Sequence, residues 1–264
     1  MPLTQDQLRR YARNISLAGV GSDGQEKLLR SSVLVIGAGG LGSAAISYLA
    51  AAGVGHIGIV DYDRVELSNL QRQILHETGD IGRLKTESAR DRIEELNPDV
   101  KIKIYTEKLD SDNALKLIKQ YDIIADGSDN FATRFAVNNA CYQAQKPLVS
   151  AAIRAFDGQL AVFKPSLDCQ PCYSCFVSSH PEDERGCSDV GVLGALAGVI
   201  GSLQALEIIK ELLGIGQSLA GRLLTFDSKT LTTRISSITR DPSCPVCSSR
   251  NETACDNKKK SLMA

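Results

Sequence analysis

A glycine-rich segment, Gly37-Ala38-Gly39-Gly40-Leu41-Gly42, stands between a short apolar run and a stretch of small, helix-forming residues. Glycine lets the backbone turn sharply and approach a phosphate closely, and the start of a following helix offers unpaired N–H groups and a positive dipole end. Asp61 closes the next apolar run, where a carboxylate can accept hydrogen bonds from ribose hydroxyls. The segment therefore predicts a nucleotide site that includes Gly37, Gly39, Gly40, Gly42 and Asp61.

The residues after Asp61 distinguish between two kinds of nucleotide. On the glycine loop alone, NAD or FAD is the ordinary ligand, and glycines that only permit helix packing are a further alternative. Next come Asp63, the string Ser68-Asn69-Leu70-Gln71-Arg72, and Lys85. An arginine can fork onto phosphate oxygens and a lysine adds a point charge. Because a triphosphate needs more cations than a dinucleotide, Arg72 and Lys85 together favour a nucleoside triphosphate, although either alone would be an ordinary surface base.

Asp129 and Asn130 directly follow another apolar run, at the expected carboxyl edge of the sheet, where ligands of such sheets bind. A carboxylate at this place can hold Mg²⁺ on a triphosphate. The alternative is that Asp129 caps a helix over residues 130–144, and one side chain can serve both purposes. The three histidines, His56, His76 and His180, have no metal-like spacing, and we assign them to structure or surface.

The cysteines include two C-x-x-C pairs, Cys172 with Cys175 and Cys244 with Cys247. Two such pairs in a chain without an export signal predict a tetrahedral Cys₄ zinc site. No open ligand position is implied, so we expect a structural site that holds the C-terminal part of the chain to its middle. A redox-active dithiol is the alternative.

Apolar runs alternate with helical patterns along most of the chain. We expect strands at 33–36, 57–60, 100–105, 123–124 and from 147, and helices at 41–52, 87–96, 114–120 and 131–144. This alternation predicts an α/β fold with a Rossmann-like, doubly wound, mainly parallel sheet. Further strands are expected at 158–163, 221–226 and 231–235, the last two as a hairpin preceded by a Gly/Ala-rich helix. Residues 4–30 are expected to form polar helices, with Asp23 as a helix cap.

Length and charge limit the classes of function. The chain has 264 residues and a formal net charge of −1, so it has room for a large core and no global basic field of the kind that binds nucleic acid. Its N-terminus is polar and lacks the apolar core of a signal peptide. The longest apolar stretch, 190–206, is shorter than a membrane span. We therefore expect a cytoplasmic protein without nucleic-acid or membrane partners.

These residues together resemble one family. The loop 37–42, Asp61, the string 68–72, Lys85 and Ser128-Asp129-Asn130 look like those of the bacterial relatives of ubiquitin-activating enzymes. This is the MoeB/ThiF/HesA group, which includes the molybdopterin-synthase adenylyltransferase and its thiamine-pathway counterpart. The similarity runs from Arg10 through Cys247, nearly the whole chain, and the string 68–72 and the helix segment 198–207 are highly specific to this group.

The resemblance implies a role for each matched position. The glycine loop would hold the phosphates of ATP, Asp61 the ribose, and Asp129 Mg²⁺. Triphosphate contacts would come from Asn69, Arg72 and Lys85, within a site completed by Asp63, Ser68, Leu70, Gln71 and Asn130. Arg13 resembles an arginine that reaches into the neighbouring subunit's ATP site, which implies a homodimer. The family's zinc ligands match the four paired cysteines.

The resemblance also implies one adenylation domain over residues 1–264. Its parts would be N-terminal helices at 1–30, a nucleotide-binding core at 31–165, and a zinc-bearing and crossover-loop part at 166–250. Cys187, which follows the polar loop 178–186, resembles a cysteine that in thiamine-pathway members can link covalently to the partner protein. A catalytic role and mere retention of this thiol both stay open.

The implied reaction is ATP-dependent adenylation of the C-terminal glycine carboxylate of a ubiquitin-like sulfur-carrier protein ending in Gly-Gly, with release of pyrophosphate. That carboxylate is ionised at neutral pH, so the reaction needs no general base. It needs placement at the α-phosphorus and screening of negative charge. We assign the carrier to molybdopterin biosynthesis, with the thiamine-pathway carrier as the alternative, and expect a separate persulfide sulfur donor.

Two functions of other classes remain as alternatives. An NAD- or FAD-dependent oxidoreductase would bind a dinucleotide tightly, which calorimetry would detect. A non-catalytic scaffold would only bind a ubiquitin-like partner, and such a protein has no use for Arg72, Lys85 and Asp129 together.

Overall fold

The computed structural model describes residues 2–177 and 191–248. One eight-stranded sheet, with strand order β3-β2-β1-β4-β5-β6-β7-β8, runs through the molecule. The parallel strands are β1 (Ser32–Ile36), β2 (His56–Val60), β3 (Lys101–Tyr105), β4 (Ile123–Asp126) and β5 (Leu148–Arg154). The antiparallel strands are β6 (Asp157–Phe163), β7 (Arg222–Asp227) and β8 (Thr232–Ser237). The prediction of a mainly parallel α/β sheet extended by C-terminal strands, including a hairpin, is therefore confirmed.

Two hydrophobic layers cover the faces of this sheet, because side chains alternate along each strand. Val33 and Val35 of β1 belong to one layer, whereas Leu34 and Ile36 belong to the other. The first layer is completed by α4 (Gly40–Ala51), α5 (Lys85–Leu96) and α10 (Gly194–Leu213), and the second by α6 (Ala114–Ile118), α7 (Phe131–Ala144) and α8 (Tyr173–Phe176). Both faces of the inner strands β1, β2 and β4 are thus largely buried, as a doubly wound sheet requires, whereas the edge strand β3 keeps Lys101 and Lys103 exposed.

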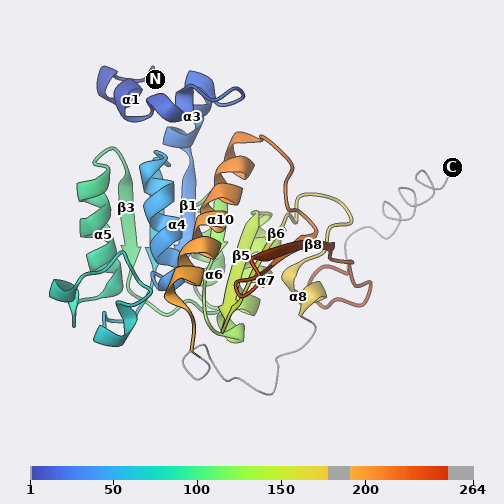
Figure 1. Cartoon of the computed structure of the whole chain (residues 1–264). Helices are drawn as coiled ribbons and strands as arrows, with labels where there is room; N and C mark the ends of the chain where they lie inside the picture. Colours follow the sequence, from blue (N-terminus) through green and yellow to red (C-terminus); the bar gives the residue numbers. More distant parts are fainter. Residues whose placement is uncertain (1, 178–190, 249–264) are drawn as a thin grey trace.

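The N-terminal helices α1 (Gln5–Arg10), α2 (Ala12–Ile15) and α3 (Gly21–Arg30) lie at the end of the molecule where the parallel strands begin (Figure 1). A buried polar contact holds them there: the hydroxyl of Tyr11, which is 1% exposed, accepts a 2.9 Å hydrogen bond from Asn97, just before β3. Burial raises the pKa of Tyr11, so it remains a neutral phenol. The prediction that Asp23 caps a helix is wrong, because α3 begins at Gly21 and Asp23 lies inside its first turn.

Helices α4 and α10 pack side by side on the sheet (Figure 1). The close approach depends on Gly201, where an added Cβ would lie 2.4 Å from the carbonyl oxygen of Leu41 and 3.0 Å from Ala44. Gly198, on the same helix, meets nothing within 4 Å. Because backbone cannot yield as a side chain does, residue 201 fixes how near α10 lies to α4.

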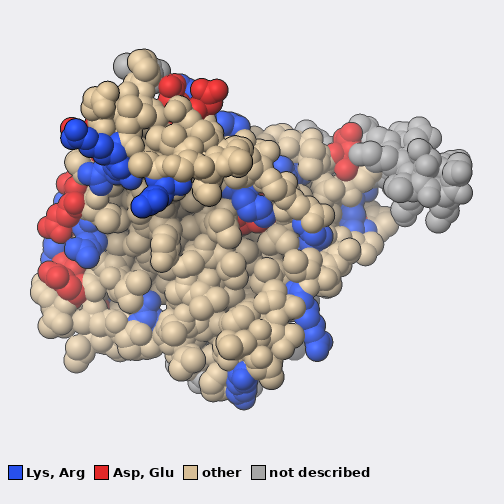
Figure 2. All heavy atoms as spheres, turned by 45° about the horizontal axis from the view of Figure 1, so that its top comes forward, with Lys and Arg blue, Asp and Glu red and all other residues tan. Residues whose placement is uncertain are grey.

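Charged side chains of both signs are scattered over the face shown in Figure 2, with broad uncharged areas between them. Among the described residues, none of the helices combines the length and the apolar character that crossing a bilayer requires.

We predict opposite effects for two alanine substitutions on α10. Gly201→Ala should destabilise the fold by about 1–3 kcal/mol because the methyl group overpacks the α4 contact. Gly198→Ala should be neutral or stabilising by up to about 1 kcal/mol, since alanine is the better helix former. Denaturant unfolding of both variants measures the difference. Equal stabilities would show that α10 can shift away from α4 at no cost.

Candidate nucleotide site and cysteine cluster

The glycine loop closes tightly on itself between β1 and α4. Gly37 has a φ of 92°, which favours glycine, and its N–H donates a 2.9 Å hydrogen bond to the carbonyl of Val60. At Gly42, a Cβ would lie 1.9 Å from the carbonyl oxygen of Gly37. Gly39 is the N-cap of α4, and no side chain caps this helix. The first turn of α4 is therefore suited to binding an anion through its backbone N–H groups.

Asp61 is held against this loop by two backbone donors. One carboxylate oxygen accepts from Ala38 N and the other from Asp63 N, both at 2.8 Å. Burial raises the pKa of Asp61, and the nearby charge of Lys85 opposes that rise. Each carboxylate oxygen keeps a second acceptor site, which fits the predicted contact with ribose hydroxyls.

Two cationic side chains stand beside the loop. Lys85, the first residue of α5, is 6% exposed, and its Nζ lies 2.9 Å from a carboxylate oxygen of Asp63. Arg72 donates to the carbonyl of Ser68 at 3.1 Å, and its Cγ lies 3.4 Å from where Gly40 would carry a Cβ. Both predicted phosphate-binding cations are therefore next to the glycine loop.

Two roles were predicted for Asp129, helix cap and Mg²⁺ ligand, and the structure assigns the cap to the next residue. Asn130 is the N-cap of α7, and its side chain accepts a 2.9 Å hydrogen bond from Thr133 N. Asp129 is therefore not the helix cap. Its carboxylate is exposed and accepts a 3.4 Å hydrogen bond from Asn130 Nδ2. An exposed carboxylate with spare acceptor sites fits a magnesium ligand.

These groups line one open cleft of about 580 Å³. From the glycine loop, the cleft continues along β5 and β6 to Tyr173 and Phe176. The predicted site residues in its lining are Gly37, Gly39, Gly40, Asp61, Asp63, Arg72, Lys85, Asp129 and Asn130. Loop, cations and carboxylates from distant parts of the sequence thus meet at the carboxyl end of the parallel strands.

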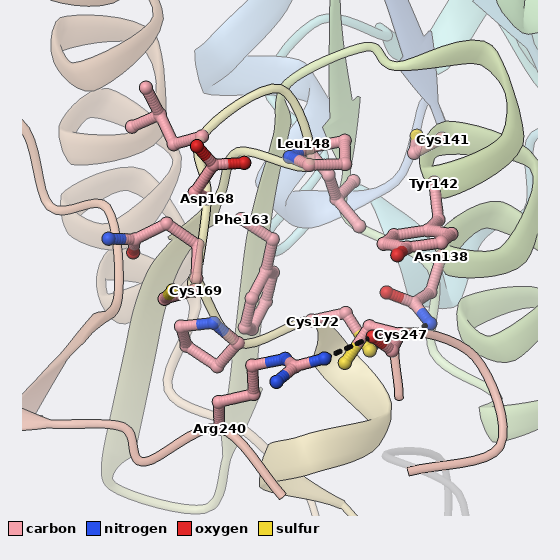
Figure 3. Close-up of a pocket in the computed structure, with 14 residues that line it drawn as sticks. Asn138, Cys141, Tyr142, Leu148, Phe163, Asp168, Cys169, Cys172, Arg240 and Cys247 are labelled. Atoms are coloured by element: carbon pink, nitrogen blue, oxygen red, sulfur yellow. Dashed lines mark hydrogen bonds between the residues drawn. The ribbon is translucent and has the colours of Figure 1, made fainter. Parts of the chain in front are cut away.

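The four paired cysteines also come together, outside the lining of this cleft. All four Sγ atoms lie within 4.8 Å of one another, with separations of 3.6 Å for Cys172–Cys244 and 3.3 Å for Cys175–Cys247. Sulfurs bound to a tetrahedral zinc lie about 3.8 Å apart, and these distances are too long for disulfides. Figure 3 shows Cys172 and Cys247 at the edge of a small pocket, where Arg240 donates a 2.6 Å hydrogen bond to the carbonyl of Cys247.

The donor set and the geometry fit a structural zinc ion. Four negatively charged sulfurs this close together repel one another, so four thiolates can coexist here only around a cation. Four protein ligands would complete the tetrahedral shell of a zinc ion, which suits a structural site.

Comparison with known proteins identifies the family. A profile of the ThiF family matches residues 11–246. The chain belongs to the ThiF family. It is 48% identical over 252 residues to a sulfur carrier protein adenylyltransferase of Thermus thermophilus, covering 94% of this chain and 93% of that protein. It is 51% identical over 227 residues to adenylyltransferase and sulfurtransferase MOCS3 of Culex quinquefasciatus, covering 85% of this chain and 51% of that protein.

The ThiF-family chain therefore spans nearly all of the bacterial relative but about half the length of the insect relatives it matches. Among solved structures it is similar to Escherichia coli MccB, with a TM-score of 0.79, 24% identity, and coverage of 91% of this chain and 72% of that one. At this identity the likeness shows a shared fold.

Some residues that the sequence predicted for the site lie outside the lining of the cleft. Gly42 packs inside the loop, and residues 68–71 lie in or beside the short helix η1 (Leu67–Asn69). There Asn69 accepts a 3.2 Å hydrogen bond from Glu66 N and so stabilises its own turn. Arg13 is exposed on α2, near the end of the sheet where the parallel strands begin. Cys187 lies outside the described residues. The roles assigned to all of these remain predictions.

Sequence reasoning missed Arg134, a 7% exposed residue of α7. Its guanidinium donates to the carbonyl of Ser128, to Ser150 Oγ at 3.0 Å and to the carbonyl of Ala151 at 2.8 Å. It also lies 3.7 Å from the buried carboxylate of Asp126. Arg134 therefore fixes the backbone that presents Asp129. The only signal in the sequence was its position, one helical turn after Asn130, and that position alone does not distinguish Arg134 from an ordinary helix residue.

We predict that the purified protein contains one zinc ion per chain. Cys244→Ser should lose it and reduce the free energy of unfolding by several kcal/mol, because the remaining thiols lose their common cation. Metal analysis and thermal unfolding measure both effects, with Cys141→Ala, a buried cysteine outside the cluster, as the control that keeps zinc. A folded wild-type protein without zinc would contradict the assignment.

Proposed function

We propose that this ThiF-family chain is an adenylyltransferase that uses ATP to activate the C-terminal glycine carboxylate of a ubiquitin-like sulfur-carrier protein. The observation that carries this proposal is the meeting of the glycine loop, Arg72, Lys85 and Asp129 in one cleft. A dinucleotide does not require both cations and a metal-binding carboxylate. The name of the Thermus relative, at 48% identity, supports the same activity.

The nucleotide would lie across the carboxyl end of β1 and β2. The glycine loop would bind phosphates through its N–H groups, Asp61 the ribose, and Arg72 and Lys85 the triphosphate. Asp129 would hold Mg²⁺, which, when bound, screens the negative charge of the phosphates. As the resemblance implies, Asn69 would also contact the triphosphate, and Gly42, Ser68, Leu70 and Gln71 would complete the nucleotide site.

The chemical step requires no proton transfer. A carboxylate oxygen of the carrier attacks the α-phosphorus of ATP, and a new C(O)–O–P bond forms. The bond between the α-phosphorus and the bridging oxygen breaks, and pyrophosphate leaves with the electron pair. In the described part of the chain, neither histidine nor cysteine lines the cleft, which agrees with chemistry based on placement and charge screening.

The remainder of the cleft offers room for the carrier's tail. Beyond the nucleotide loop it is lined by Ile153, Leu160, Phe176 and neighbouring residues of β5, β6 and α8. An extended Gly-Gly terminus has no side chains to exclude it from a narrow passage. We propose that the tail runs along this surface so that its carboxylate reaches the α-phosphate.

Arg13 would complete the site of a neighbouring subunit. Within one chain it lies on the edge where the parallel strands begin, whereas the nucleotide loop lies where they end. It therefore cannot serve its own site without unfolding of the Tyr11 contact. In a homodimer it would contribute positive charge to the partner's triphosphate.

The product is a mixed anhydride that a sulfur nucleophile can open. We propose a separate persulfide donor as that nucleophile, and Cys187 as a candidate for a covalent link to the carrier. Molybdopterin biosynthesis is our first assignment of the pathway, with the thiamine-pathway carrier as the alternative. A cytoplasmic location follows from these partners.

The first test is ATP–pyrophosphate exchange with each of two Gly-Gly-ending carriers, those of molybdopterin and of thiamine synthesis. Asp129→Ala should lower carrier-dependent exchange by at least about a hundredfold, because charge screening at the phosphates is lost. Asp99→Ala, an exposed aspartate at the other edge of the sheet, is the matched control and should keep full exchange. Full activity of folded Asp129→Ala, or calorimetric binding of NAD or FAD instead of ATP, would overturn the proposal.

The second test asks whether Arg13 acts across the dimer. Arg13→Ala and Asp129→Ala subunits, each inactive alone, are mixed under conditions that allow subunit exchange. If Arg13 serves the neighbouring site, one site of each mixed dimer is intact and exchange returns to about a quarter of the wild-type rate. No recovery in proven mixed dimers would place Arg13 outside the partner's site.

A further inference from the structure

Both polar backbone atoms of Ala38, in the middle of the glycine loop, are held by side chains from elsewhere. Its N–H donates to Asp61, and its carbonyl accepts a 3.0 Å hydrogen bond from Nε2 of His76. Ala38 is fully buried and His76 is 6% exposed. The orientation of this part of the loop therefore depends on one buried imidazole.

The other ring nitrogen of His76 connects it to α5. Nδ1 lies 2.8 Å from Ser88 Oγ, and Ser88 Oγ lies 2.7 Å from a carboxylate oxygen of Asp80, in η2 (Thr78–Asp80). Ser88 is one turn after Lys85 on the same helix, so the two lie on neighbouring positions of one helix face. His76 thus bridges the glycine loop and the helix that carries a phosphate-binding lysine.

Hydrogen-bond chemistry determines which nitrogen carries the proton. A carbonyl oxygen only accepts, so Nε2 must carry hydrogen in both the neutral and the charged ring. Burial lowers the pKa of His76, with Lys85 acting in the same direction and Asp80 and Asp61 against it. The bond to Ala38 therefore persists whichever protonation state the ring adopts.

Because a peptide unit is planar, the hydrogen bond from His76 to the Ala38 carbonyl also sets the direction of the Gly39 N–H. The Ala38 carbonyl and the Gly39 N–H belong to one trans peptide unit and point in opposite directions. Because the carbonyl points to the buried His76, the N–H of Gly39 points the other way, and Gly39 lines the cleft. Without the bond, this peptide could rotate at low cost, since glycine tolerates both signs of φ, and a carbonyl oxygen could then face the phosphates.

We infer that His76 is a positioning residue of the nucleotide site: it holds the Ala38–Gly39 peptide so that an N–H, not a carbonyl, meets the triphosphate, and it fixes the loop relative to Lys85. The inference rests on the proposed use of ATP. It assigns a role to a histidine that the sequence placed in structure or surface.

Two substitutions separate the two contacts of the ring. In His76→Gln the amide can reach the position of Nε2 and donate to Ala38, whereas in His76→Asn it reaches only the position of Nδ1, towards Ser88. We expect His76→Asn to raise the KM for ATP and the Kd for a non-hydrolysable ATP analogue roughly tenfold, and His76→Gln to stay within about threefold of wild type. The KM for the carrier should change less than about twofold in both. His56→Asn, at the exposed first position of β2, is the control without effect.

A histidine with a merely structural role would give a different pattern. Both variants would then lower the unfolding midpoint with an unchanged KM for ATP, or raise that KM equally, and either result overturns the inference. Should His76→Asn not fold, Ser88→Ala takes its place, with a severalfold rise in the KM for ATP expected and an unchanged KM contradicting us. Wild-type protein that neither binds ATP nor catalyses exchange would instead refute the proposed function itself.

Discussion

The close contact between Gly42 and the carbonyl of Gly37 sets the positions of the helices and strand ends that form the nucleotide cleft. A single added carbon at residue 42 would lie 1.9 Å from that oxygen, so α4 can begin only directly above the end of β1. Helix α10 lies on α4 through Gly201, and Gln204 of α10 donates to the carbonyls of Asp126 and Val149 at 3.0 and 2.9 Å. The close contact between residues 42 and 37 positions α4, α4 positions α10, and α10 holds the end of β4, which Asp129 follows.

The cationic side chains of the cleft are oriented by neighbouring carboxylates before any ligand binds. Lys85 is paired with Asp63, and Arg134 lies near Asp126, so the buried cations are held by carboxylates and do not drift or repel one another. A triphosphate entering such a site meets groups that are already oriented, which reduces the reorganisation it must drive. The same pairs explain why the site tolerates burial of a lysine that is 6% exposed.

The sequence predicted the elements well and their mutual contacts poorly. The bounds of α7 agree at both ends with the expected helix, because Asn130 and the change to Lys146-Pro147 mark them in the chain itself. Asp23 was misplaced because the backbone enters the helix at Gly21, before the side chain that looked like a cap. His76 and Arg134 were missed since their partners, Ala38 and Ser150, are distant in sequence or lack any distinctive pattern. The glycine loop, Arg72, Lys85 and Asp129 could be proposed from the sequence because each carries its chemistry in its own residue type.

The cysteine cluster joins positions 72 residues apart, Cys172 with Cys244 and Cys175 with Cys247. A cross-link through a bound ion would close that length of chain into a ring and, in the chain-entropy treatment of such closures, would disfavour the unfolded state by about 4 kcal/mol. All of α10 lies within the ring. Loss of the ion would therefore remove a restraint on the segment that includes α10, the helix against which α4 and its glycine loop pack.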